Sequence, residues 1–189
     1  MKFSLQQTNI LIKALTCSVI TLWLSGCENK PSFSYDFERP EDLDRLKWKC
    51  GVQFTISDQY ATQGKKSLAL HLFSPGKDDF NKYRGVIFQN FSPDWSDDDF
   101  LIIDVYNPQD KPLPMTLRID DRKSPPYDDR FNKELLFLPG ENQLLIPLET
   151  LYTTEGNRQL NRKNIRHVSL FYSYPKENYL LYIDNCRLE

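Results

Sequence analysis

The feature that most constrains this chain is a succession of short apolar or alternating runs, each bounded by turn-forming residues. Val, Ile, Leu, Phe and Tyr dominate the runs, and Pro, Gly, Asn and Asp separate them. β-Branched and aromatic residues favour strands, whereas a helix needs a longer stretch of 3.6-residue periodicity. The pattern therefore predicts an all-β sandwich. We expect strands in the regions 33–38, 52–57, 67–73, 84–91, 100–107, 115–120, 133–138, 142–148, 168–174 and 179–188.

The connections between these runs carry few helix signals. Residues 39–47 ("RPEDLDRLK") and 147–152 ("PLETLY") are each long enough for one helical turn. Residues 138–142 ("LPGEN") combine Pro, Gly and Asn, which favour a tight turn, and so predict a hairpin between the flanking strands.

Three of the runs have one apolar face and one mixed face, because successive side chains of a strand point to opposite sides. The apolar face holds Leu101, Ile103, Val105, Met115, Leu117, Ile119, Val168, Leu170 and Tyr172. The mixed face holds Ile102, Asp104, Tyr106, Thr116, Arg118, Asp120, His167, Ser169 and Phe171. If the three strands are neighbours, they form a sheet with one solvated surface that carries polar and aromatic side chains.

The N-terminus predicts export. Lys2 and Lys13 precede an apolar run that ends at Cys27 and falls short of the ~20 residues needed to span a bilayer. A charged start, a short apolar run and small residues before a break are typical of a secretory signal. "LSGC", residues 24–27, resembles the lipobox of bacterial lipoproteins, in which the cysteine is lipidated; an ordinary signal with a chance cysteine is the alternative.

The lipobox resemblance implies a signal peptide at 1–26, a lipidated Cys27 and tether at 27–32, and one domain at 33–189. Acyl chains, palmitate among them, would anchor the protein in the cell envelope. In such lipoproteins Glu28, rather than Asp, after the cysteine favours the outer membrane, and we expect the periplasmic face.

Charge and cysteine usage narrow the partners further. The chain has 24 basic and 26 acidic residues, and no basic stripe, so nucleic acid is excluded as an expected partner. Cys50 and Cys186 would remain in the exported domain, where an oxidising compartment favours a disulfide between them. Two buried free thiols are the alternative.

Several motifs in order resemble the galactose-binding-like β-jelly rolls of bacterial carbohydrate-binding modules, family 11-like and related. These are "SYDFE", "LKW", "GKKSLALHL", "DWSDDDFLIIDVYNP", "LRIDD", "DRFN", "LPGENQLLIPL" and "YLLYIDNCRLE", spread over about 33–189. The resemblance implies a jelly roll that holds a sugar on a concave sheet face. It also implies a structural Ca²⁺ near the terminal strands, with Glu38 and Asp184 as ligands; solvated strand-end acids are the alternative.

The stretch from 116 to 132 ("TLRIDDRKSPPYDDRFN") is the strongest site candidate. Sugars bind to aromatic rings under their C–H faces and to planar polar groups that reach paired hydroxyls. We expect the ligand-binding residues to be Asp104, Tyr106, Arg118, Asp120, Tyr127, Arg130 and His167. A structural Arg–Asp network that braces a long loop is the alternative.

Catalysis is not expected. His71 and His167 are the only histidines, no nucleophile motif such as GxSxG is present, and no Cys/His cluster suggests zinc. Asp104 and Asp120 are the one pair weighed for glycoside hydrolysis, which needs two carboxylates across one cleft. The sequence thus predicts a non-catalytic, lipid-anchored envelope protein that binds a saccharide. The alternative is a structural or assembly lipoprotein that uses the same face to bind another envelope protein.

Overall fold

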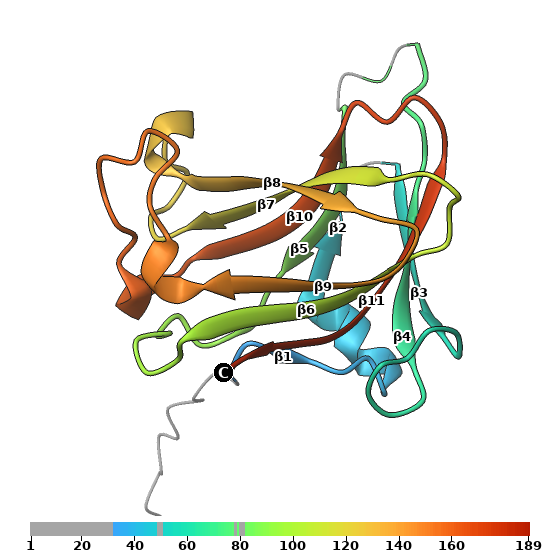
Figure 1. Ribbon diagram of the computed structural model, residues 1–189, viewed down its shortest axis with the longest axis horizontal. Helices are drawn as coiled ribbons and strands as arrows, with labels where there is room; N and C mark the ends of the chain where they lie inside the picture. The colour runs from blue at the N-terminus through green and yellow to red at the C-terminus, as the bar shows by residue number, and fades with distance from the viewer. Residues whose placement is uncertain (1–31, 49–50, 78, 80–81) are drawn as a thin grey trace, which may run out of the picture.

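The alternating runs form antiparallel strands in two sheets that pack face to face (Figure 1). The computed structural model describes residues 32–48, 51–77, 79 and 82–189. The terminal sheet, named for its two chain-end strands, contains β1 (Ser34–Tyr35), β3 (Val52–Ser57), β4 (Ser67–Leu72), β6 (Phe100–Asn107), β9 (Gly140–Pro147) and β11 (Tyr179–Leu188). The facing sheet contains β2 (Leu46–Trp48), β5 (Tyr83–Phe88), β7 (Leu113–Asp120), β8 (Phe131–Phe137) and β10 (His167–Ser173).

The strand order shows which strands are central in each sheet. In the terminal sheet the order is β3-β4-β11-β6-β9, with β1 also paired to β11, and in the facing sheet it is β2-β5-β10-β7-β8. The expected single helical turns are present as η1 (Pro40–Arg45) and η3 (Leu148–Thr150), and η2 (Tyr127–Asp129) and η4 (Arg162–Asn164) add two more. The predicted all-β jelly-roll sandwich is confirmed.

The apolar faces of both sheets meet in one core. Ile103, Leu117 and Leu170 have no exposed surface, as their alternation predicts. An aromatic cluster of Phe33, Phe88, Phe91 and Trp95 extends this core, with ring centroids 5.3–5.8 Å apart among the paired rings. Burying one such apolar side chain contributes roughly 1.5–3 kcal/mol, so the shared core holds the two sheets together.

The segment 138–142 is not a hairpin turn, contrary to the sequence prediction. β8 pairs with β7 in the facing sheet, and β9 pairs with β6 in the terminal sheet. The segment therefore crosses from one sheet to the other. Its shape is set by Asn142, whose side chain accepts from Leu138 N–H at 2.9 Å and donates to the Leu138 carbonyl at 2.8 Å. Gly140, with φ of 89°, supplies the left-handed backbone at the crossing.

The three mixed faces do not form one surface. β7 and β10 are neighbours, with Arg118 opposite Ser169, but β6 lies in the terminal sheet between β11 and β9. The assumption that all three strands were adjacent was therefore wrong for β6. Periodicity assigns a face to a residue, but only the pairing of strands assigns that face to a sheet.

Two expectations concern residues that the structure does not describe. Cys27, the expected lipidation site, lies outside the described residues, and so does Cys50. Cys186 is a buried thiol on β11, and because its expected partner lies outside the described residues, the disulfide stays a prediction. Within the described ranges, no helix has the length and apolar character to cross a membrane.

Candidate binding groove

The outer face of the facing sheet carries a hollow of about 540 Å³. It spans four neighbouring strands, because β5, β10, β7 and β8 each contribute outward-pointing residues. The loops after β7 and β9 close one side of it. The lining consists of Tyr83, Thr116, Arg118, Tyr127, Arg130, Asn132, Glu134, Thr154, Phe171 and Ser173.

This hollow adjoins others on the same sheet and so forms part of a longer groove. A hollow of about 390 Å³ shares Arg118 with it and also contains Asp120 and His167. A third, of about 460 Å³, shares Thr116, Glu134 and Ser173. We call the three together the groove. It follows β7 from Pro114 to Asp120, which is about 20 Å at the rise of a strand.

Strand register places the groove residues in rows across the sheet. Arg118 lies opposite Asn132 on one side and Ser169 on the other. In the next outward row Thr116 lies opposite Glu134 and Phe171. Cross-strand partners have Cβ atoms about 4.5–5.5 Å apart, so each row presents several polar or aromatic groups within the reach of one small ligand.

Aromatic side chains from three elements line the hollow of about 540 Å³. Tyr83 meets Phe171 edge-on, with ring centroids 5.6 Å apart, and Tyr127 is 65% exposed on η2. Gly85 fixes the position of Phe171, because a Cβ at Gly85 would lie 2.6 Å from the Phe171 Cβ and 2.1 Å from the Leu170 carbonyl oxygen. Only glycine lets β5 and β10 approach this closely under that ring.

The two groove arginines are held in fixed positions by different partners. Arg118 Nε donates to both carboxylate oxygens of Asp120, at 2.9 and 3.0 Å. Arg130 instead donates from Nε and Nη2 to the carbonyl of Pro125, at 2.9 and 2.6 Å. Arg130 therefore has its guanidinium plane fixed without an acid partner, in the part of the chain that the structure describes.

The rest of the 116–132 segment is a structural brace, as the alternative interpretation expected. Arg158 donates to both oxygens of the buried Asp121, at 2.6 and 2.9 Å, and to Asp129 at 2.9 Å. Arg122 donates to Asp129 at 2.8 Å. Burial raises the pKa of Asp121, but hydrogen bonds from Arg158 and the Asn161 amide outweigh it and hold the pKa below its ordinary value. The segment thus both braces a loop and lines the groove.

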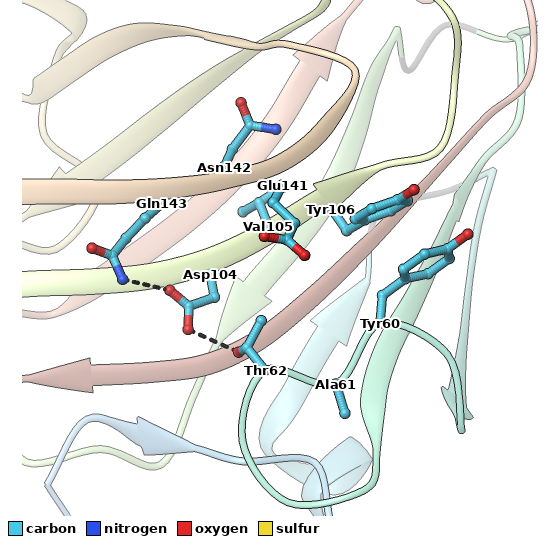
Figure 2. Close-up of a pocket in the computed structure, with 9 residues that line it drawn as sticks. All are labelled: Tyr60, Ala61, Thr62, Asp104, Val105, Tyr106, Glu141, Asn142 and Gln143. Carbon is cyan, nitrogen blue, oxygen red and sulfur yellow. Dashed lines mark hydrogen bonds between the residues drawn. The ribbon is translucent and has the colours of Figure 1, made fainter.

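Asp104 and Tyr106, two of the expected ligand-binding residues, lie on the opposite side of the sandwich. They line a separate hollow of about 350 Å³ on the terminal sheet. Figure 2 shows Tyr106 beside Tyr60, and the two rings stack with centroids 3.5 Å apart. Asp104 accepts bonds from Thr62, Gln143 and Asn185 at 2.8–2.9 Å. The Asp104 carboxylate is therefore already engaged by neighbouring side chains, and its bond to Thr62 holds the loop between β3 and β4 in place.

The placement of Asp104 and Asp120 on different sheets also removes the carboxylate pair weighed for glycoside hydrolysis. Such a pair must flank one bond in one cleft. Here the two acids line different hollows, and each is engaged by neighbouring side chains.

Glu38 and Asp184 both reach the loop between β3 and β4, where backbone amides face one carboxylate oxygen of each. Glu38 Oε1 accepts from the Lys65 and Lys66 amides at 2.6 and 2.8 Å. Asp184 Oδ2 accepts from the Thr62 and Gln63 amides at 2.7 and 2.9 Å. Ca²⁺ takes oxygen ligands.

No group of three or more His, Cys, Asp or Glu that could hold a metal occurs among the described residues. We call the arrangement of Glu38 and Asp184 around residues 62–66 the carboxylate clamp. It satisfies backbone amides directly, so the loop has a physical explanation that does not require the ion.

Five of the expected ligand-binding residues thus meet in the groove, namely Arg118, Asp120, Tyr127, Arg130 and His167. Sequence reasoning missed Tyr83, Asn132, Glu134, Thr154 and Phe171 as lining residues. Phe171 shares its alternation with His167, so its face was predictable. The others depend on which strands and loops become neighbours, which local patterns do not show.

The fold is that of jelly-roll carbohydrate-binding modules. The family 11 module from Clostridium thermocellum, solved with a β-1,3-1,4-mixed-linked tetrasaccharide, has a TM-score of 0.58 and 13% identity, over 82% of this chain and 94% of that module. A family 28 module specific for non-crystalline cellulose has a TM-score of 0.55 and 14% identity, over 84% of this chain and 97% of that module. At these identities the likeness shows the fold. No family model matches the sequence, and no curated protein does.

An exo-β-agarase is also similar, with a TM-score of 0.65 and 17% identity over 84% of this chain. The match covers only 24% of the agarase chain. The two modules above, in contrast, are matched over nearly their whole length, and both are carbohydrate-binding modules.

Proposed function

We propose that this protein is a non-catalytic, lipid-anchored envelope protein that binds a saccharide chain in the groove of the facing sheet. The observation that carries the proposal is the groove itself. It is an extended depression whose lining combines exposed Tyr83 and Tyr127 with planar polar groups. A flat or filled face would favour a protein partner, whereas a hollow with exposed rings favours a sugar.

The chemistry of the groove suits sugar hydroxyls. Aromatic rings pack against the apolar C–H face of a sugar ring, and guanidinium, amide and carboxylate groups bond to adjacent hydroxyls. Arg118 and Arg130 are already fixed by Asp120 and the Pro125 carbonyl, so binding would immobilise few side chains. The length of the groove along β7 favours a polymer over a single sugar.

Affinity electrophoresis tests the proposal with the full chain purified in a mild detergent. Suitable gels contain mixed-linked β-glucan, non-crystalline cellulose derivatives, agarose or charged polysaccharides. We expect retardation in at least one gel, and a loss of about three- to tenfold in affinity for Tyr127→Ala. Tyr60→Ala, on the terminal sheet, is the matched control and should bind as the parent does. Loss with Tyr60→Ala alone, or no retardation in any gel, would exclude the groove as the site.

The anchor is part of the same proposal and rests on the lipobox-like residues 24–27. Cys27 would carry the acyl chains, and Glu28 would direct the protein to the outer membrane. Labelling with a palmitate analogue in cells should mark the parent and leave Cys27→Ser unmarked. An equally labelled variant would exclude Cys27 as the lipidation site.

A further inference from the structure

Positive charge gathers in the groove of an otherwise acidic chain. The two hollows that share Arg118 are lined by five cations (Arg118, Arg122, Lys123, Arg130 and Arg166) and by the acids Asp120 and Glu134, a net charge of +3. The whole chain has a net charge of −2. A cleft lined by one sign of charge concentrates ligands of the opposite sign.

Only part of this charge is balanced within the protein. Arg118 is paired with Asp120, and Arg122 is paired with Asp129. Lys123, Arg130 and Arg166 have no carboxylate within ion-pair distance among the described residues. Of the two lining acids, Glu134 alone has no ion-pair partner among the described residues. Three unpaired cations therefore face one unpaired acid.

Two of these cations are positioned by the backbone rather than by an acid. Arg130 donates from Nε and Nη2 to the Pro125 carbonyl, and Nη1 is left without a hydrogen bond to any described atom. Arg166 is exposed, and its backbone N–H donates to the Asp120 carbonyl at 2.8 Å, which fixes the start of its side chain beside the groove. A fixed, planar guanidinium suits the paired oxygens of a carboxylate or sulfate group.

We propose that the saccharide bound in the groove is anionic, with carboxylate or sulfate groups along its chain. This inference rests on the proposed function and specifies its ligand class. Tyr83, Tyr127 and Phe171 would contact the sugar rings, while Arg130, Arg166 and Lys123 would contact the charged substituents. Neutral polymers with the same backbone would lose those charge-assisted bonds.

The test compares polymers that differ in charge but share a backbone. One pair is polygalacturonate and its methyl ester, and the other is sulfated galactan and agarose. We expect the full chain to bind at least one charged polymer about tenfold more tightly than its neutral partner. Salt of about 1 M, where the Debye length is about 3 Å, should remove most of the difference.

Charge-removing variants separate a built site from general attraction. Arg130→Gln and Arg166→Gln should each weaken binding to the charged polymer by about tenfold, which is several times more than they weaken binding to its neutral partner. Lys65→Gln removes the same charge on the far side of the sandwich and should change neither. Circular dichroism melts of each variant establish that the fold is retained.

The outcomes are distinguishable. If a neutral polymer binds as tightly as its charged partner, the inference of an anionic ligand is wrong and the groove as a saccharide site stands. Equal weakening by Lys65→Gln and Arg130→Gln would mean non-specific attraction and also overturns the inference. If no saccharide of either kind binds, the proposed function falls together with it.

Discussion

Asp121 shows how one residue determines the shape of the groove wall. Its carboxylate is 2% exposed and accepts two bonds from Arg158 and one from the Asn161 amide, at 2.6–2.9 Å. These bonds connect the loop after β7 to the segment before β10. Both sides of the hollow lined by Arg118 and Arg166 therefore depend on the Asp121 carboxylate.

Acid should weaken this connection in a defined pH range. Hydrogen bonds hold the pKa of Asp121 below its ordinary value of 3.8, so its contribution to stability is complete above pH 3.8 and is lost as the pH falls through the folded-state pKa. Asp121→Asn should lower the free energy of unfolding at pH 7 by roughly 2–4 kcal/mol, because it leaves Arg158 with Asp129 alone. Urea unfolding at a series of pH values measures both effects.

Asp128→Asn is the matched control for this change. Asp128 is exposed in the same loop and takes part in no ion pair among the described residues, so its loss should change stability by less than about 0.5 kcal/mol. If Asp121→Asn kept the parent's full loss of stability in acid, Asp121 would not be the group responsible.

At the scale of elements, the carboxylate clamp holds the loop between β3 and β4 against the terminal strands. Gly64 has φ of 72°, and a Cβ there would lie 2.2 Å from Glu38 Oε1. Gly64→Ala should therefore combine backbone strain with displacement of Glu38, at a cost of roughly 2–4 kcal/mol. Gly156, with φ of 69° and nothing within 4 Å of its Cβ position, supplies a control with backbone strain alone. Thermal melts that fell equally for both variants would argue against the clamp.

The same clamp gives a prediction about metal. Because the Lys65, Lys66, Thr62 and Gln63 amides satisfy Glu38 and Asp184, we expect a chelator to leave the melting temperature unchanged. A ligand that binds only the folded state stabilises it by RT ln(1 + [L]/Kd), so removing bound Ca²⁺ would lower the melting temperature. A clear drop in EDTA, reversed by added Ca²⁺, would restore the calcium site that the sequence suggested.

Most strands could be predicted from sequence because alternation is a local property. β6, β7 and β10 fall where their periodicity places them, and their inward residues form the core. Which strands become neighbours is not local, and this is why Asp104 and Tyr106 were assigned to the wrong surface. The hairpin prediction for residues 138–142 was wrong for a related reason. Pro, Gly and Asn indicate that the chain changes direction, but they do not indicate which sheet the next strand joins. β2 was missed because a three-residue strand is too short for periodicity.

At the scale of the whole molecule, Cys186 reports on global unfolding. It is 1% exposed on β11, which lies between β4 and β6, and burial raises the pKa of its thiol. We expect a thiol reagent to modify Cys186 only as fast as the whole domain unfolds. Mass spectrometry of the peptide that contains Cys186 measures the labelling. Rapid labelling of the native protein would contradict this, whereas a peptide cross-linked to Cys50 would confirm the disulfide predicted from the sequence.

The pairing of β1 with the end of β11 makes the domain easy to insert into other chains. Ser34 lies opposite Arg187, so β1 runs beside the end of β11 in the terminal sheet (Figure 1). The groove opens on the other sheet. A host protein could therefore accept the whole domain within a surface loop by replacing a short span of its own backbone. The groove would then lie on the sheet away from the junction, so selection could alter its lining and the host independently.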